Sequence, residues 1–305
     1  MKKILSRLIE KENGTALILV SVAMLGLLAM TGLVIDGGSL YVTKSHLQKT
    51  ANAAALSGAQ KLIEGEIAVR GIVEEVLHFH KEQTSLQSIS IQEEDLVRLS
   101  LEKKVDLSFA SLLGMEQAPV QATASAEVGI MGQAKGAVPL GIDERFELEL
   151  YEEYELKTDT SGVDHGWFGI LALGGPGAAT YYDNFMNGYQ HEIRVGDIIE
   201  TQTGNVAGKT RDAVKERIDN CPYTLETAID KKCSRIILVP VYQAYDTSGG
   251  QIKKVMVKGF AYFYLTKPVS GKDTSVHGMF IKMTGPGKID ESAASRGAFS
   301  IRLTE

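Results

Sequence analysis

The sequence predicts an α+β protein that crosses a membrane once near its N-terminus and carries a β-rich domain at its C-terminal end. Three patterns support this fold class: an uncharged apolar run, a helical spacing of small apolar residues after it, and repeated strand patterns in the second half. The chain is expected to comprise a basic cytoplasmic leader (1–14), a transmembrane helix (15–35), an amphipathic helix continuing into a small α/β segment (36–135), and a β-rich extracytoplasmic domain (136–305).

The average composition hides this organisation. The chain has 305 residues, of which 44% are hydrophobic and 23% charged, and its net charge is -6. These values exclude collagen, an intrinsically disordered chain and a disulfide-dense miniprotein. The acidic balance disfavours nucleic acid as a partner. The mean hydropathy of -0.03 resembles that of a soluble protein, but an average does not reveal an apolar segment at one end.

The run from Thr15 to Ile35 contains no charged side chain. As an α-helix it would be about 32 Å long, which matches a hydrocarbon core of about 30 Å. A buried core helix is one alternative, although such helices usually carry a polar stripe over this length. A cleaved secretory signal is another, with a small-residue cleavage site at Gly37-Gly38-Ser39, although its apolar region is usually shorter.

The flanking charges predict the orientation of the span. The charged residues that precede it are Lys2, Lys3, Arg7, Glu10, Lys11 and Glu12. Four basic residues against two acidic ones favour a cytoplasmic N-terminus. They give the first 35 residues a charge of +2, which leaves -8 for the remainder. The bulk of the chain is therefore expected on the extracytoplasmic side.

An amphipathic helix is expected to continue from the span over residues 36–63. Its apolar side is a stripe of leucines and small residues at helical spacing, formed by Leu40, Leu47, Ala51, Ala54, Gly58 and Leu62. The Gly37-Gly38 pair either kinks the helix at the membrane exit or is tolerated within it. The stripe packs either on the protein's own sheet, which we favour, or on a partner helix.

The first 60 residues contain a distinctive combination of features. These are Asn13-Gly14-Thr15-Ala16, the apolar span, Asp36, Leu40-Tyr41, Leu47-Gln48, and the run Ala51-Asn52-Ala53-Ala54-Ala55-Leu56-Ser57-Gly58-Ala59. Together they resemble the TadE/TadG-like N-terminal module of the Tad (tight adherence) Flp-pilus assembly systems, over about residues 8–60. The chain departs from this family at Asn52, where the family usually has an aspartate.

The resemblance implies a non-enzymatic, single-pass protein of the cell membrane that serves a pilus assembly or surface-secretion apparatus. The implied partners are the lipid bilayer, pilus subunits, the membrane platform of a Tad system, and further copies of the chain. Asp36 is a predicted subunit contact. Some relatives are cut by a prepilin peptidase after a glycine at the position of Gly14, but the glutamate typical of such sites is replaced by Leu19, which favours an uncut chain.

The remaining elements are predicted from periodicity. A helix is expected over residues 67–82, with Ile67, Ile72, Val76 and Phe79 on its apolar side. Strands are expected at 97–101, 104–109, 119–129, 145–150, 167–173, 191–201 (two, around a Gly196-Asp197 turn), 235–245, 254–265, 276–283 and 298–303, and a second helix at 210–219. The helix and first strands resemble the arrangement in pilins.

Two segments resemble a phosphate-binding and a metal-binding motif, but each lacks a feature that the motif requires. The segment from Gly204 to Thr210 resembles a phosphate-binding loop but has three residues between its glycines instead of four. The segment from Asp246 to Gly250 resembles the metal-binding DxSxS motif of von Willebrand-type domains but lacks the second serine. We interpret the first as a turn with Thr210 as a helix N-cap and the second as a hairpin turn.

No catalytic, cofactor-binding or metal-binding residue is assigned. His78 and His80, two positions apart on a helix, point about 200° from each other and cannot share a metal. A membrane-tethered ligand-binding or sensor module is the alternative function. In that reading Trp167, Phe168 and the Tyr181-Tyr182 pair line a binding face, although core packing is the simpler role for them. A tethered hydrolase is a third reading.

The two cysteines predict one disulfide. Cys221 and Cys233 are separated by 11 residues and are expected outside the cytoplasm, where disulfides persist. The bridge would connect the end of the helix at 210–219 to the strand at 235–245. Two reduced, buried cysteines are the alternative.

Overall fold

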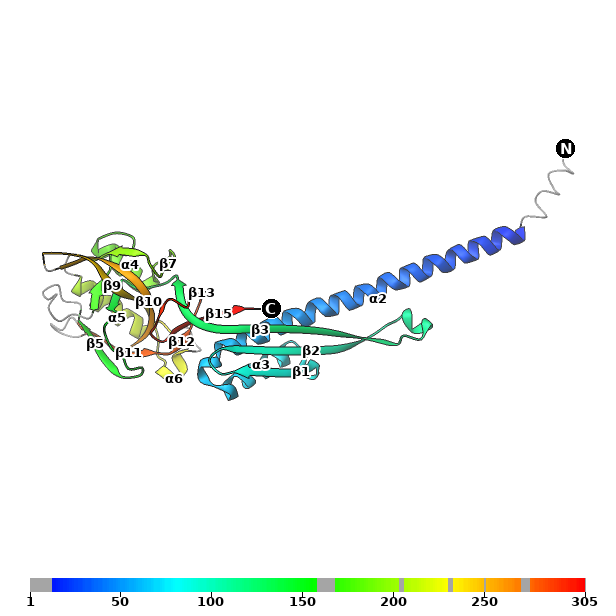
Figure 1. Cartoon of the computed structure of the whole chain (residues 1–305), viewed down its shortest axis with the longest axis horizontal. Coiled ribbons are helices and arrows are strands. Elements are labelled where there is room, and N and C mark those ends of the chain that lie inside the picture. The colour runs from blue at the N-terminus through cyan, green and yellow to red at the C-terminus, as the bar shows by residue number, and fades with distance from the viewer. Residues whose placement is uncertain are drawn as a thin grey trace, which may run out of the picture.

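The computed structural model describes residues 13–157, 168–202, 206–229, 233–249, 251–269 and 275–304. One long helix projects from a body built of two β-sheets, and the start of the helix lies far from both sheets (Figure 1). Most of the basic leader lies outside the described residues, as do His165, Trp167, Gly204 and Gly250.

The long helix, α2, runs without interruption from Asn13 to Gln60, which confirms that the apolar span continues into the amphipathic helix. Its 48 residues make a rod about 72 Å long. Gly37 and Gly38 lie inside it, and no atom lies within 4 Å of the place where a Cβ would stand. The pair is therefore tolerated in an exposed part of the helix.

The second half of α2 packs on the first sheet. Strands β1 (Leu86–Gln92), β2 (Leu96–Asp106) and β3 (Gln117–Ala134) form an antiparallel meander. The second half of α2 packs against β2 and β3, and helix α3 (Glu66–Phe79) packs against α2 in the same core (Figure 1). The short 3-10 helices η1 (Leu62–Glu64) and η2 (Gln83–Ser85) flank α3, and η3 (Ala110–Leu113) forms the turn between β2 and β3.

The core between α2, α3 and this sheet contains the predicted small-residue stripe. Leu47, Ala51, Ala54 and Leu62 are at most 1% exposed. The alternating residues of β3 from Val120 to Val128 are buried in the same cluster. The interpretation that the stripe packs on the protein's own sheet is confirmed.

The C-terminal part of the chain contributes to the first sheet as well. Strand β15 (Ala298–Leu303) pairs antiparallel with β3, and β12 (Met283–Thr284) pairs parallel with β15. The end of β3 also pairs with β13 (Gly287–Ile289) and β7 (Ile193–Arg194). Residues from both sides of position 135 therefore build this sheet.

The second sheet forms the body farthest from the start of α2. Its strand order is β5 (Glu153–Lys157), β11 (Ser275–Ile281), β10 (Gln251–Lys267), β9 (Ile236–Ser248), β4 (Leu140–Asp143) and β6 (Phe168–Ile170). Strands β8 (Ile198–Glu200) and β14 (Ala294–Ser295) pair with β10. The predicted hairpin of two long strands is confirmed as β9 and β10, which pair antiparallel from Ser248↔Gln251 onward.

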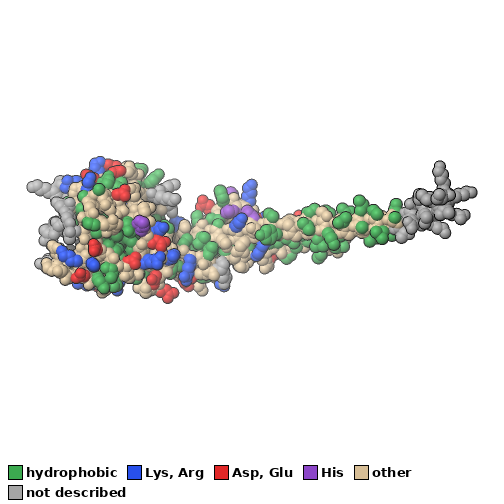
Figure 2. All heavy atoms as spheres, turned by 90° about the horizontal axis from the view of Figure 1, so that it is seen from above, with side chains coloured by type: hydrophobic (Ala, Val, Ile, Leu, Met, Phe, Trp, Pro, Cys, Tyr) green, Lys and Arg blue, Asp and Glu red, His purple; other side chains and the backbone are tan. Residues whose placement is uncertain are grey.

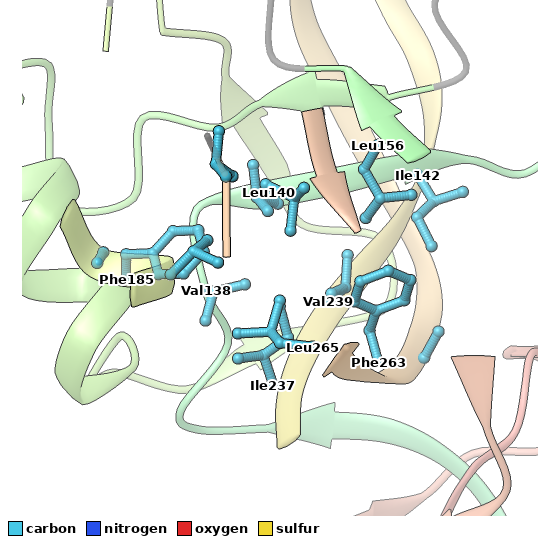
Figure 3. Packing of buried hydrophobic residues seen from close by; sticks show 14 of the residues in the cluster. Val138, Leu140, Ile142, Leu156, Phe185, Ile237, Val239, Phe263 and Leu265 are labelled. Carbon is cyan, nitrogen blue, oxygen red and sulfur yellow. The ribbon is translucent and has the colours of Figure 1, made fainter. Parts of the chain in front are cut away.

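Helices cover one face of the second sheet. These are α4 (Ala178–Asn187) and α5 (Ala207–Asp219), and a short helix α6 (Leu225–Ala228) follows them. Figure 3 shows Phe185 of α4 beside Val138 and Leu140, with Ile237, Val239, Phe263 and Leu265 of β9 and β10 in the same core.

Two predictions about local structure were wrong, and one helix was not predicted. Residues 145–150 form no strand: Phe146, Leu148 and Leu150 pack on the core as side chains, so their alternation is satisfied without a ladder of backbone hydrogen bonds. Residues 97–101 and 104–109 belong largely to one strand, β2. Helix α4 was not predicted, because its aromatic and polar residues have only modest helix propensity.

The buried face of α3 matches the prediction only in part: Val76 packs against the core as predicted, but Ile67 and Phe79 do not. Val69, Val73 and Leu77 are at most 1% exposed, whereas Ile67 and Phe79 are 90% and 81% exposed. Val69, Val73, Leu77 and Phe79 all lie on one broad side of the helix, and Ile67 lies outside it. Val69 and Val73 approach Gly58 of α2, so the edge that contains them packs inward.

Candidate membrane anchor and exit site

The N-terminal half of α2 projects from the folded body. Its large apolar side chains are at least 49% exposed, and only 6% of its most apolar stretch is buried. Figure 2 shows a shaft of hydrophobic side chains leading away from the body. By length and composition, α2 is the one helix of the described ranges that is able to cross a membrane. Gly14, the candidate processing position, lies in its first turn.

Two polar side chains of the span, Ser21 and Thr31, are hydrogen-bonded within the helix. The hydroxyl of Ser21 donates to the carbonyl of Leu17, and the hydroxyl of Thr31 donates to the carbonyl of Leu27, each at 2.8 Å. A hydroxyl in hydrocarbon is costly unless it is hydrogen-bonded, so these contacts make both residues compatible with the bilayer.

Asp36, directly after the span, binds the turn between β2 and β3. Its carboxylate accepts hydrogen bonds from the backbone N–H groups of Ser108 (2.8 Å), Phe109 (2.9 Å) and Ala110 (2.7 Å). These N–H groups stand at the N-terminus of η3, where a helix leaves its donors unsatisfied and favours an anion. The backbone N–H of Ala110, followed by those of Ser108 and Phe109, holds the pKa of Asp36 below its usual value.

Gly32 allows the same turn to reach the helix. A Cβ at Gly32 would stand 2.5 Å from Cγ of Phe109, so only glycine leaves room for this ring. Gly32 and Asp36 are one helical turn apart and therefore lie on the same side of α2. We call Gly32 and Asp36 of α2, together with residues 108–110, the exit site.

Beyond the exit site, polar side chains of α2 bind the backbone of β3. The ammonium of Lys44 donates to the carbonyl of Gln121, and the amide of Gln48 donates to the carbonyl of Thr123 at 2.6 Å. Gln48 also donates to the side chain of Asn52 at 3.0 Å. The residue that departs from the family pattern thus accepts a hydrogen bond inside the chain.

A buried carboxylate, that of Glu82, lies between α2 and β2. Glu82 is 2% exposed and accepts hydrogen bonds from Ser85 and from Lys103 of β2, each at 2.6 Å. His46 of α2 lies 3.5 Å from the same carboxylate. Burial acts to raise the pKa of Glu82, but the hydrogen bonds from Lys103 and Ser85 outweigh it and hold the pKa below its usual value.

The predicted disulfide is present. Cys221 and Cys233 are bonded, with their Cα atoms 5.4 Å apart, and they connect the segment after α5 to the segment before β9. The guanidinium of Arg217, in the last turn of α5, donates to the carbonyls of Phe185 (2.7 Å), Met186 (3.0 Å) and Ser234 (2.6 Å). Burial lowers the pKa of Arg217 to about 10.

Thr210, Tyr181 and Tyr182, which the sequence singled out, have structural partners. Thr210 is not an N-cap: it lies inside α5, and its hydroxyl bonds to the Val206 carbonyl and the Tyr181 hydroxyl. Tyr181 is 3% exposed in the core, and Tyr182 donates to Glu216. No group of three or more His, Cys, Asp or Glu in the described ranges is placed to hold a metal.

The turn between β2 and β3 is the feature that sequence reasoning missed. Residues 107–115 read LSFASLLGM, an uncharged segment bounded by Asp106 and Glu116. Exposed turns seldom contain so many large apolar residues, and this composition was the available signal. Its position beside Asp36 depends on the docking of α2 on the sheet, which no local pattern indicates.

Comparison with known proteins adds one result that coincides with α2. Residues 14–61 match the Tad family, described as "Putative Flp pilus-assembly TadE/G-like". The Tad match covers the same residues as α2 almost to the ends, so the module consists of the span, the exit-site residues Gly32 and Asp36, and the docked half of the helix. No curated protein and no solved structure matches the chain.

Proposed function

We propose that this chain is a non-enzymatic, membrane-anchored component of a Tad-type Flp pilus assembly or surface-secretion apparatus. The observation that supports the proposal is that the Tad match coincides with a single helix, α2. The first half of α2 is apolar and exposed, and its second half packs on the first sheet. A single rigid helix of this kind couples the position of a folded body to a membrane.

In this proposal the N-terminus is cytoplasmic and the two sheets lie outside the cytoplasm. The excess of basic residues before the span supports this orientation. The Cys221–Cys233 disulfide supports it independently, because disulfides persist mainly in oxidising compartments. The proposed partners are pilus subunits, the membrane platform and further copies of the chain.

The proposal is tested by replacing the span without disturbing the exit site. Residues 15–31 are exchanged for an unrelated uncharged helix of the same length, so that Gly32 and Asp36 keep their contacts. The variant and the native chain are expressed in cells that lack their own copy, and surface pili are counted by electron microscopy. We expect the native chain to restore pili and the exchanged variant to remain in the membrane without restoring them.

The outcomes separate this proposal from the alternative. Pili that are normal in cells without the chain would remove it from assembly and favour a membrane-tethered binding module. Full restoration by the exchanged variant would limit the span to simple anchoring. Genes for a secretion ATPase, platform proteins and a small Flp pilin beside this gene would add independent support.

A further inference from the structure

The turn between β2 and β3 exposes an unusual amount of apolar surface. We call residues 107–115 the hairpin tip. Within it, Leu112 and Leu113 are 83% and 81% exposed, and Met115 is 57% exposed. Burial of these exposed apolar side chains away from water would be favourable, so such a patch indicates a contact with another apolar surface.

The hairpin tip is fixed beside the end of the membrane span. The three hydrogen bonds to Asp36 and the contact of Phe109 with Gly32 hold it on α2. Figure 1 shows the hairpin of β2 and β3 extending along α2 toward its N-terminal end, past the rest of the sheet. Because residues 108–110 contact Gly32 and Asp36, the exposed leucines that follow them stand near the level where the apolar surface of α2 begins.

The backbone of the hairpin tip is suited to an apolar environment. Its N–H groups at residues 108–110 bind Asp36, and those of Leu107, Leu112, Gly114 and Met115 bind carbonyls within the hairpin. The hydroxyl of Ser111 donates to the carbonyl of Ser108 at 2.9 Å. These hydrogen-bonded N–H groups and the absence of charge lower the cost of placing the segment at the edge of a bilayer.

We propose that the hairpin tip inserts into the interfacial layer of the lipid bilayer, as a second membrane contact beside the span. This inference rests on the proposed anchoring of α2 in a membrane. Charged Asp106 and Glu116 stand at the base of the tip and limit the depth of insertion. A helix alone leaves the body free to turn about the helix axis, whereas two contacts fix the face that the first sheet presents to its surroundings.

The test measures the depth of three positions in the full-length chain. Single substitutions Leu112→Cys, Ile67→Cys and Leu25→Cys each receive an environment-sensitive fluorophore, while the native cysteines stay paired in their disulfide. Each protein is reconstituted into phosphatidylcholine vesicles that contain a nitroxide-bearing lipid. Ile67 is the matched control, because it is apolar, 90% exposed and remote from the exit site. Leu25 reports on the span itself.

Strong quenching by the lipid nitroxide is expected at Leu112 and Leu25, with little at Ile67. A Leu112 label that behaves like the Ile67 label, while Leu25 is quenched, overturns the inference and leaves the anchoring intact. An unquenched Leu25 label overturns the anchoring and the inference with it. A Leu112 label protected from both the lipid nitroxide and aqueous iodide indicates cover by a second copy or another protein, and also overturns it.

A second variant separates insertion from a change in folding. Leu112→Glu with Leu113→Glu places two charges on side chains that are already exposed, so the fold is expected to be unchanged. With the fluorophore at Met115→Cys, this pair of substitutions is expected to abolish the quenching by the lipid nitroxide. The control Ile67→Glu, with the same label at residue 115, is expected to leave the quenching unchanged, and a loss in both would contradict insertion of the tip.

Discussion

Asp36 joins two segments that are 72 to 74 positions apart in the sequence. It was singled out as a subunit contact, and that role remains a prediction. Within the chain, its carboxylate satisfies the N-terminus of η3 and leaves the residue 7% exposed. Among the described residues, the groups that bind this charge next to the span are backbone N–H donors.

Asp36→Asn is expected to loosen the hairpin tip, because a neutral amide is a weaker acceptor than a carboxylate. The pKa of Asp36 is lowered in the folded chain, so its stabilisation is present above the ordinary value of 3.8 and is lost as the pH falls through the lowered pKa. Hydrogen exchange at residues 108–110 is expected to be faster in the variant at neutral pH.

Asp106→Asn is the matched control, because Asp106 lies in the same hairpin and is exposed, with a hydrogen bond from Gln117. Its exchange at residues 108–110 is expected to match that of the native chain. Equal exchange in all three proteins would refute the structural role of Asp36.

Gly32→Ala is expected to displace Phe109, because the new Cβ would stand 2.5 to 2.6 Å from three carbons of that side chain. Overpacking of this kind typically costs about 1–3 kcal/mol. Gly26→Ala is the control: no atom lies within 4 Å of its Cβ position. Gly32→Ala is expected to speed hydrogen exchange at residues 108–110, and Gly26→Ala is expected to leave it unchanged. Similar exchange in both variants would contradict the close approach of Phe109 to Gly32.

At the scale of elements, α3 shows how tertiary packing selects between two faces. Leu77 is 1% exposed, whereas Phe79, two positions later, is 81% exposed. Leu77→Ala is expected to lower the free energy of unfolding by about 2–5 kcal/mol, because it leaves a cavity. Phe79→Ala is expected to change it by less than about 0.5 kcal/mol. Chemical denaturation of both variants measures the difference, and comparable losses would contradict the assigned face.

The β9–β10 hairpin can be predicted from its own residues, whereas helix α4 cannot. The hairpin follows from two long apolar runs joined by polar and glycine residues, and it was predicted correctly. Helix α4 begins after Gly177, whose φ of 139° is a conformation that residues with a Cβ rarely adopt. The helix buries Tyr181 and Phe185 in the core. Its stability comes from that burial and from Arg217, which caps its last carbonyls, and neither contact is visible in its own residues.

At the scale of the whole molecule, β15 connects the end of the chain to the Tad-matching module. It pairs with β3, the strand on which α2 also lies. The helix, the first sheet and the second sheet are therefore linked through β3, which continues from the hairpin beside the membrane exit toward the distal body. A force on the distal body would reach the span through this strand.

The proposed orientation predicts which side of the membrane each part occupies. In intact cells, a membrane-impermeant thiol reagent is expected to label Ile67→Cys and not Lys3→Cys. Permeabilised cells are expected to label both positions, which controls for reactivity. Labelling of Lys3→Cys alone in intact cells would reverse the orientation and place the Cys221–Cys233 pair in a reducing compartment.

The sequence by itself determined the features that depend on neighbouring residues. The uncharged run, the helical stripe that follows it, the alternation in β3 and the hairpin turn all result from local periodicity and charge. The resemblance to the Tad module was likewise visible in the first 60 residues, and the disulfide followed from having two cysteines and an expected oxidising compartment.

Only the tertiary structure decided which partners these elements meet. The inward face of α3, the return of β15 to β3 and the contact of Asp36 with the hairpin tip all join residues far apart in the chain. Periodicity states that a face is apolar, but it does not state what the face packs against, because that depends on the relative placement of distant elements. The exit site is an example: Gly32 and Asp36 at the end of the span contact a turn that lies more than 70 positions later in the sequence.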